Sequence, residues 1–206
     1  MSRERRMDLC FALGSLCFLI GPFPGYVDLV GPKADAITFF VGSILFTAGG
    51  AHQLWISLGG PKADIWVAGV QFAGTLFFNV TTFAAMHTAL TNPEYDRLVW
   101  RPDAFGSICF LVSGVIAYVV SERHGLLPRR GKNGWWEPGV NLLGCIFFGI
   151  SAVAGYLVPS SGSILDLAAA NWNTALGAAC FLACALAGLR TVAKERDQTT
   201  LREVSA

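Results

Sequence analysis

Six long apolar runs divide the chain and restrict what it can fold into. Each is close to the roughly 20 residues that a helix needs to cross about 30 Å of hydrocarbon. None has the alternation of apolar and polar positions that marks a membrane barrel strand. Only 14% of the residues are charged, against about 25% in a typical soluble domain. The sequence therefore predicts an all-α, polytopic membrane bundle of six transmembrane helices, over residues 9–30, 36–58, 65–90, 104–121, 140–158 and 168–189.

Two prolines, Pro22 and Pro24, interrupt the first run. Membrane helices tolerate proline where neighbouring groups satisfy the freed carbonyls. A cleaved signal peptide is the alternative interpretation, but no small-residue cleavage site lies at a convincing distance, and the run carries the same motif as the others. We therefore predict that the first run is a helix of the mature protein.

The lysines and arginines are distributed unevenly between the two sides of such a bundle. If the N-terminus lies inside, only Lys33, Arg97 and Arg101 fall in outer segments, and the other twelve of the fifteen basic residues fall in inner segments. An excess of Lys and Arg marks the cytoplasmic side of a membrane. The sequence therefore predicts cytoplasmic N- and C-termini and a multi-pass protein of the inner, cytoplasmic membrane.

One short motif occurs in every run: a glycine, a small residue and, four positions after the glycine, a phenylalanine. Residues four apart share a helix face, so the glycine lets a neighbouring backbone approach and the phenylalanine fills the space beside it. Close packing of this kind is a main source of helix association in lipid. The predicted helix-packing residues are Gly14 and Phe18, Gly42 and Phe46, Gly74 and Phe78, Gly106 and Phe110, Gly144 and Phe148, and Gly177 and Phe181.

The motif is most alike in the first and fourth runs, where residues 14–18 read GSLCF and residues 106–110 read GSICF. The second run then pairs with the fifth, and the third with the sixth. Because three helices are an odd number, the second copy must enter the membrane from the opposite side. The chain is predicted to be a 3+3 inverted-topology repeat with halves 1–98 and 99–206, an arrangement common in transporters. The alternative is plain bundle packing without shared ancestry.

Longer segments around the motif resemble a known family. QFAGTLFFNVTTFAA at 71–85, VWRPDAFGSICFL at 99–111 and GSILF at 42–46 are similar to the YrhK-like small membrane proteins of bacteria. The resemblance implies a small bacterial membrane protein in which two units span most of the chain. It implies no activity, cofactor or substrate.

Uncharged polar residues form a stripe along the third run, at spacings of four, four and three that place them on one helix face. A shorter polar pair lies in the second run, and one amide opens the fifth. These groups predict either a narrow polar path for a small uncharged ligand or ordinary interhelical hydrogen bonds. The third-run asparagine is expected to face the bundle interior. The candidate ligand- or pore-lining residues are Gln71, Thr75, Asn79, Thr82, Ser43, Thr47 and Asn141.

Acidic residues stand at the start of every run, where a carboxylate can accept from free backbone N–H groups and favours the positive end of the helix dipole. No charged residue lies in the middle of a run, which argues against proton- or ion-driven transport. The predicted helix-start residues are Asp8, Asp35, Asp64, Asp103, Glu137 and Asp166.

Residues for reactive chemistry are sparse. No nucleophile, zinc-protease or phosphate-loop motif occurs, so we expect no enzymatic activity. Cys180 and Cys184 share a helix face, where packing is a simpler explanation than metal binding. His52, His87 and His124 are expected at different depths or in a polar segment, so they predict no haem or metal site and no cofactor. A net charge of +1 gives no basic field for nucleic acid.

Two functions fit these features. The inverted repeat and the uncharged polar stripe favour a channel or facilitator for a small uncharged solute. The small-residue helix faces of the glycine motif, taken without a ligand site, favour a non-catalytic structural or accessory subunit. The predicted partners are the lipid bilayer and, in the second case, another copy of the chain or a larger membrane complex.

Overall fold

The computed structural model describes residues 1–87, 90–121 and 136–204. Apart from two strands of two residues each, β1 (Leu157–Val158) and β2 (Ser163–Ile164), its elements are helical, which confirms the predicted all-α class. The helices are α1 (Arg3–Ile20), α2 (Pro24–Val30), α3 (Pro32–Ser57), α4 (Lys62–Ala85), α5 (Asn92–Tyr95), the π-helix η1 (Asp96–Trp100), α6 (Arg101–Ser121), α7 (Glu137–Ala154) and α8 (Leu167–Val204).

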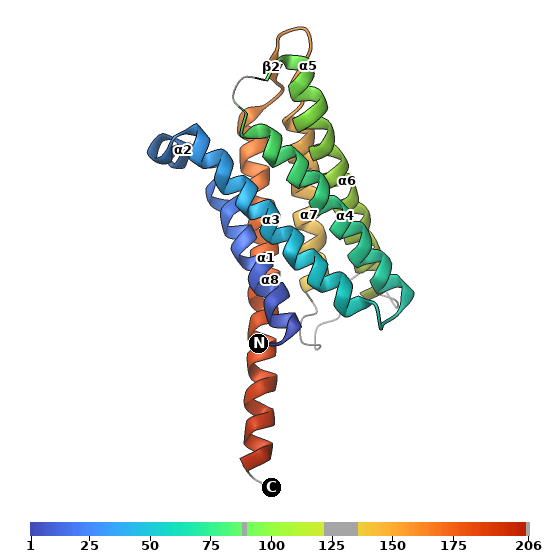
Figure 1. The fold of residues 1–206 in the computed structure, drawn as a ribbon. Coiled ribbons are helices and arrows are strands. Elements are labelled where there is room, and N and C mark those ends of the chain that lie inside the picture. Colours follow the sequence, from blue (N-terminus) through green and yellow to red (C-terminus); the bar gives the residue numbers. More distant parts are fainter. Residues whose placement is uncertain (88–89, 122–135, 205–206) are drawn as a thin grey trace.

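Six long helices form a closed ring in chain order. The contacts run from α1 to α3, α4, α6, α7 and α8 in turn, and α8 returns to α1. The lower end of the ring in Figure 1 carries the N-terminus and the α3–α4 turn, and the upper end carries α2, α5 and the β1–β2 pair. Helix α8 has 38 residues and continues below the ring (Figure 1).

Five helical segments of the described chain are long and apolar enough to cross a membrane, and the bent pair α1–α2 is a sixth if it counts as one span. The bundle is therefore compatible with an integral, multi-pass membrane protein. The helix predicted over 9–30 is broken, because α1 ends at Ile20 and α2 leaves at 91°. Pro24 stands in the first turn of α2, where a missing N–H costs nothing, whereas a proline inside a helix breaks it. Figure 1 shows α2 projecting from the ring.

Helix α3 begins where the chain turns back from α2. Gly31 adopts a φ of 81° at this turn, in the left-handed region that only glycine enters without strain. The Tyr26 and Thr38 hydroxyls share a hydrogen bond of 2.8 Å that ties α2 to the first turns of α3.

The fourth span begins earlier than the apolar run predicts. Helices α5, η1 and α6 form one continuous segment, Asn92–Ser121, although the run starts at residue 104. Thr91 and Glu94 form a capping box at its start, and Arg101 pairs with Asp96 at 2.7 Å. These polar contacts let a helix form over residues that hydropathy alone excludes. The predicted division at residue 98 falls inside this segment, and the two-half organisation stays a prediction.

The glycine motif lies where neighbouring helices touch. A Cβ atom added to Gly14 would lie 2.9 Å from the Phe46 ring and 3.0 Å from the Gly42 carbonyl oxygen, and one added to Gly42 would lie 3.0 Å from the Phe18 ring. Each glycine of the pair therefore receives the phenylalanine of the other helix. The same reciprocal contact joins α4 to α6 and α7 to α8, through Gly74, Phe78, Gly106 and Phe110 and through Gly144, Phe148, Gly177 and Phe181.

This contact occurs three times, each time between two helices that follow one another in the ring. The ring is thus three similar hairpins, α1–α3, α4–α6 and α7–α8. The predicted 3+3 inverted repeat divides the same helices differently, and it stays a prediction.

Candidate functional site

The six motif phenylalanines meet on the axis of the ring and form its buried core, here called the phenylalanine cluster: Phe18, Phe46, Phe78, Phe110, Phe148 and Phe181. Within each hairpin the two rings pack edge-on or tilted, with centroids 5.6 Å apart in α1–α3, 5.0 Å in α4–α6 and 5.5 Å in α7–α8. Such geometries are the favoured ones for aromatic pairs.

The cluster has two layers because the helices alternate in direction. Phe18, Phe78 and Phe148 line a cavity at the upper end of the ring. Phe46 and Phe181 line a cavity at the lower end. The sixth ring, Phe110, is 2% exposed and packs 6.4 Å from Phe46 and 5.8 Å from Phe181. The two cavities are therefore separated by two layers of aromatic rings in direct contact.

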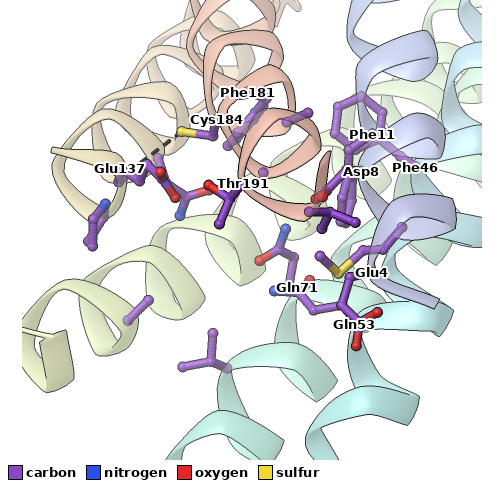
Figure 2. Close-up of a pocket in the computed structure, with 18 residues that line it drawn as sticks. Glu4, Asp8, Phe11, Phe46, Gln53, Gln71, Glu137, Phe181, Cys184 and Thr191 are labelled. Carbon is purple, nitrogen blue, oxygen red and sulfur yellow. Dashed lines mark hydrogen bonds between the residues drawn. The ribbon is translucent and has the colours of Figure 1, made fainter. Parts of the chain in front are cut away.

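The lower cavity has a volume of about 530 Å³, and all six long helices contribute to its wall. Its floor is aromatic, with Phe11, Phe46 and Phe181. Three carboxylates line its wall, from Glu4 and Asp8 on α1 and from Glu137 at the start of α7. In Figure 2, Asp8 and Glu137 lie on opposite sides of the cavity, and the Gln71 amide points toward the space between them. None of the described residues that line this cavity carries a positive charge.

Asp8 is the most buried of these acids, with 7% of its surface exposed. Within the described part of the chain it makes no hydrogen bond and no ion pair, and its charged neighbours are Glu4 and Glu137. It packs against α8 at Gly188, where an added Cβ would lie 2.6 Å from Asp8 Oδ2. A glycine is therefore needed for the carboxylate to occupy this position.

Three amides complete the polar wall of the lower cavity. Gln71 accepts a hydrogen bond of 3.3 Å from the Ser113 hydroxyl. The Oε1 atom of Gln53 is buried and has no partner. Asn141 lies beside Glu137 on α7. Cys184 donates a 3.5 Å hydrogen bond to the Glu137 carbonyl (Figure 2), which holds the start of α7 against α8.

The upper cavity has a volume of about 360 Å³ and is also acidic. Asp35 of α3 and Asp103 of α6 line it, and the Oδ1 atom of Asp35 is buried without a partner. Tyr95 lies close enough to Asp103 to interact with it electrostatically. The Trp100 indole N–H donates a hydrogen bond of 2.9 Å to the Ala152 carbonyl, which fixes the wall between α6 and α7. The described lining again contains no basic residue.

The residues of the predicted polar stripe lie in different environments in the structure. Gln71 and Asn141 line the lower cavity, and Thr82 lines the upper one. The Thr82 hydroxyl also shares a 2.8 Å hydrogen bond with Ser43 on α3. Thr75 is fully buried and donates to the Phe72 carbonyl of its own helix at 2.7 Å.

Asn79 does not lie on the axis of the ring. Its amide donates a hydrogen bond of 2.9 Å to the Thr47 hydroxyl on α3. Asn79 also lines a lateral groove of about 560 Å³ between α3 and α4. The other lining residues of this groove are almost all apolar, and several, such as Ile44 and Phe83, are exposed on the outside of the ring. The expectation that Asn79 faces the bundle interior is therefore wrong.

The cavity carboxylates were not predicted as site residues from the sequence. Four of them were predicted helix starts, and Glu4 was not singled out; the four are Asp8, Asp35, Asp103 and Glu137. Asp8 does not cap α1, since the helix begins at Arg3 and Ser2 accepts the 3.3 Å capping hydrogen bond from the Arg5 N–H. Asp35 makes no capping hydrogen bond in α3 either. Asp166 does cap, since it accepts from the Ala169 N–H at 2.9 Å. The sequence signal for the Asp8 case is Ser2, six residues earlier, because serine is a preferred N-cap residue and its position starts the helix before the acid.

The described residues give little information on the predictions about metals and histidines. No group of three His, Cys, Asp or Glu side chains in the described residues could hold a metal ion. His87 packs against Phe83 at the lateral groove, with ring centroids 5.6 Å apart. His124 lies outside the described residues.

Comparisons with known proteins return no match to a family model, to a curated protein or to a solved structure. The resemblance to the YrhK-like proteins therefore stays a prediction. A proposal about function has to start from the two cavities.

Proposed function

We propose that the chain is a membrane facilitator that passes a small solute between the lower and upper cavities, with the phenylalanine cluster as its closed gate. One observation carries the proposal: two cavities, each lined by all six long helices, reach the same aromatic cluster from opposite ends. A ring that lines one cavity touches a ring that lines the other, with centroids 5.6 Å apart for Phe46 and Phe18 and 5.5 Å apart for Phe181 and Phe148.

Passage through this gate requires aromatic rings to move. The rings fill the axis, so a solute crosses only when side chains from both layers turn aside or when one hairpin moves outward. Ligand sites in membrane proteins are typically lined by helices around an axial cavity, with polar groups facing the interior. The polar walls of both cavities fit this pattern, because their carboxylates and amides lie toward the axis and the apolar residues cover the outside of the ring.

The distribution of basic residues gives the proposal an orientation. Arg3, Arg5, Arg6, Lys62 and Arg190 lie at the lower end, and Lys33, Arg97 and Arg101 lie at the upper end. The larger number of basic residues at the lower end supports a cytoplasmic position for that end and for both termini. The lower cavity then opens toward the cytoplasm of a cell bounded by this membrane.

Flux into reconstituted vesicles tests the proposal. Purified chain in liposomes is expected to raise the flux of at least one small solute, from a set of urea, glycerol and choline, above that of protein-free vesicles. Replacing the central ring, Phe110→Leu or Phe110→Ala, is expected to increase that flux because it thins the gate. Phe105→Ala is the matched control, since Phe105 lies on the same helix and is 54% exposed on the outside. Flux no higher than in protein-free vesicles, for wild type and both gate variants, excludes the facilitator.

A structural or accessory subunit is the second candidate, and the lateral groove favours it. The groove is apolar, and the Oδ1 atom of Asn79 is buried there without a partner. A neighbouring helix that packs in the groove would bury its exposed apolar residues, such as Ile44 and Phe83. Under this alternative, Asn79→Leu changes the oligomeric state measured by light scattering in detergent, and no solute flux is found.

A further inference from the structure

We infer that the lower cavity is the binding site for a small organic cation, with the Asp8 carboxylate as its anchor. The inference deepens the proposed function by naming the class of solute. It departs from the expectation of an uncharged solute, which rested on the inverted repeat and the uncharged polar stripe of the third run.

The burial of Asp8 is the first reason. A carboxylate removed from water is costly unless a hydrogen-bond donor or a positive charge compensates it. Asp8 is 7% exposed and has neither within the described part of the chain. Its charged neighbours, Glu4 and Glu137, have the same sign, so they increase the need for a cation in the space that the three acids share.

The way Asp8 is held is the second reason. The carboxylate lies against the α8 backbone at Gly188, with no space for even a Cβ atom. Packing thus fixes its position, as expected for a ligand contact and unlike a solvated acid on a surface. Gln71 is also largely buried, at 9% exposed, and its amide faces the same space.

The shape and chemistry of the cavity select an organic cation. Its volume of about 530 Å³ is suited to a small molecule. The floor consists of Phe11, Phe46 and Phe181, with Phe11 and Phe46 packed edge-on at 5.7 Å. Aromatic rings attract organic ammonium groups through the cation–π interaction. The Gln71 amide, which points toward the same space, offers a hydrogen bond to a polar group elsewhere on the ligand.

The upper cavity repeats the same chemistry beyond the gate. Asp35 and Asp103 face it, and its floor is again aromatic, with Phe18, Phe78 and Phe148. A cation that leaves the lower cavity through the gate therefore reaches a second acidic, aromatic site. A neutral solute would have no charge attraction to either set of carboxylates and would gain only hydrogen bonds from them.

The test compares choline with 3,3-dimethylbutan-1-ol, its uncharged isostere, by isothermal titration of the full chain in detergent micelles. Choline is expected to bind at least tenfold more tightly than the isostere. Asp8→Asn is expected to weaken choline binding at least tenfold, and Asp64→Asn is the matched control. Asp64 lies at the same end of the ring on α4 and is exposed outside the cavity, so its replacement removes the same charge without removing the anchor.

Gly188→Ala provides a second variant that leaves the charge unchanged. Its added Cβ displaces the Asp8 carboxylate, and choline binding is expected to weaken while the isostere is unaffected. Equal binding of choline and the isostere by the wild-type chain overturns the inference, and so does unchanged choline binding by a folded Asp8→Asn variant. The wild-type comparison holds even if a variant fails to fold.

Failure of this inference differs from failure of the proposed function. Flux of urea or glycerol without choline binding removes the cation site and keeps the facilitator. Choline binding that depends on Asp8, without flux of any solute, keeps the cation site and removes the facilitator.

Discussion

Replacing Gly74 by alanine tests how tightly the hairpins are packed. An added Cβ would lie 2.7 Å from the Phe110 ring and 3.0 Å from the Cys109 Cβ. Carbon atoms in ordinary contact lie about 3.5–4.0 Å apart, so α4 and α6 must separate by about 1 Å. Phe110 has no free space to move into, because it is 2% exposed and packed against four of the other five rings. Overpacking of a well-filled core costs about 1–3 kcal/mol.

Gly69 on the same helix provides the matched control. A Cβ added there would lie 3.9 Å from Leu54 Cδ1 and meet no other neighbour. Both alanines gain about 1 kcal/mol of helix propensity over glycine, and this gain cancels in the comparison. The free energy of unfolding of Gly74→Ala is therefore expected to be about 1–3 kcal/mol below that of Gly69→Ala.

Equilibrium unfolding in mixed detergent and SDS micelles, followed by circular dichroism, measures this difference. The two variants differ by one methyl group at two positions five residues apart, so the denatured states are closely matched. Equal free energies of unfolding for the two variants would refute the claim that glycine sets the distance between α4 and α6.

Other substitutions test single contacts by the same unfolding measurement. Asp166→Ala removes the cap of α8 and is expected to lower the free energy of unfolding by about 1 kcal/mol; no loss means that the cap contributes nothing. Asn79→Leu removes the hydrogen bond to Thr47 and is expected to cost about 0.6 kcal/mol, with no change in solute flux because Asn79 lies off the axis; altered flux would place it on the path. Trp100→Phe removes the hydrogen bond to the Ala152 carbonyl, with an expected loss of about 1 kcal/mol that an unchanged unfolding midpoint would contradict.

The fold was predictable where local sequence alone determines it. Apolar length identified the spans, and the glycine–phenylalanine spacing identified the residues now seen at the helix contacts, such as Gly14 and Phe46. The ring closure of α8 on α1 was not predictable, since it depends on contacts between segments far apart in the sequence. The break after Ile20 was visible as two prolines, but their tolerance in membrane helices made a continuous span equally acceptable.

The geometry of a helix explains why the polar stripe of α4 divides. Each residue turns the helix by about 100°, so Asn79 is rotated by about 80° from Gln71, whereas Thr82 is rotated by only about 20°. Gln71 and Thr82 accordingly line the two axial cavities, and Asn79 faces α3 and the lateral groove. Spacings of four place these residues on one broad helix face. The rotation of each residue about the helix axis decides which of them face the axis of the ring.

The acidic walls of the cavities were hidden by a competing local explanation. An acid near the start of an apolar run is usually a cap, and Asp166 is one. Asp8 has the same sequence setting, but Ser2 already caps α1, which leaves the Asp8 side chain one turn inside the helix. Only the position of α8 beside α1 shows that this side chain is buried and faces a cavity.

Cysteine labelling in sealed vesicles tests most directly whether two cavities meet at a closed gate. Asn141→Cys in the lower cavity and Thr174→Cys in the upper one are introduced singly into a chain whose own cysteines are replaced. Leu76→Cys, on the outside of α4, is the lipid-facing control. A membrane-impermeant maleimide is expected to label position 141 from the lower side only, position 174 from the upper side only, and position 76 from neither. Labelling of either cavity position from both sides, or of both positions from the same side, would contradict the closed gate between opposed cavities.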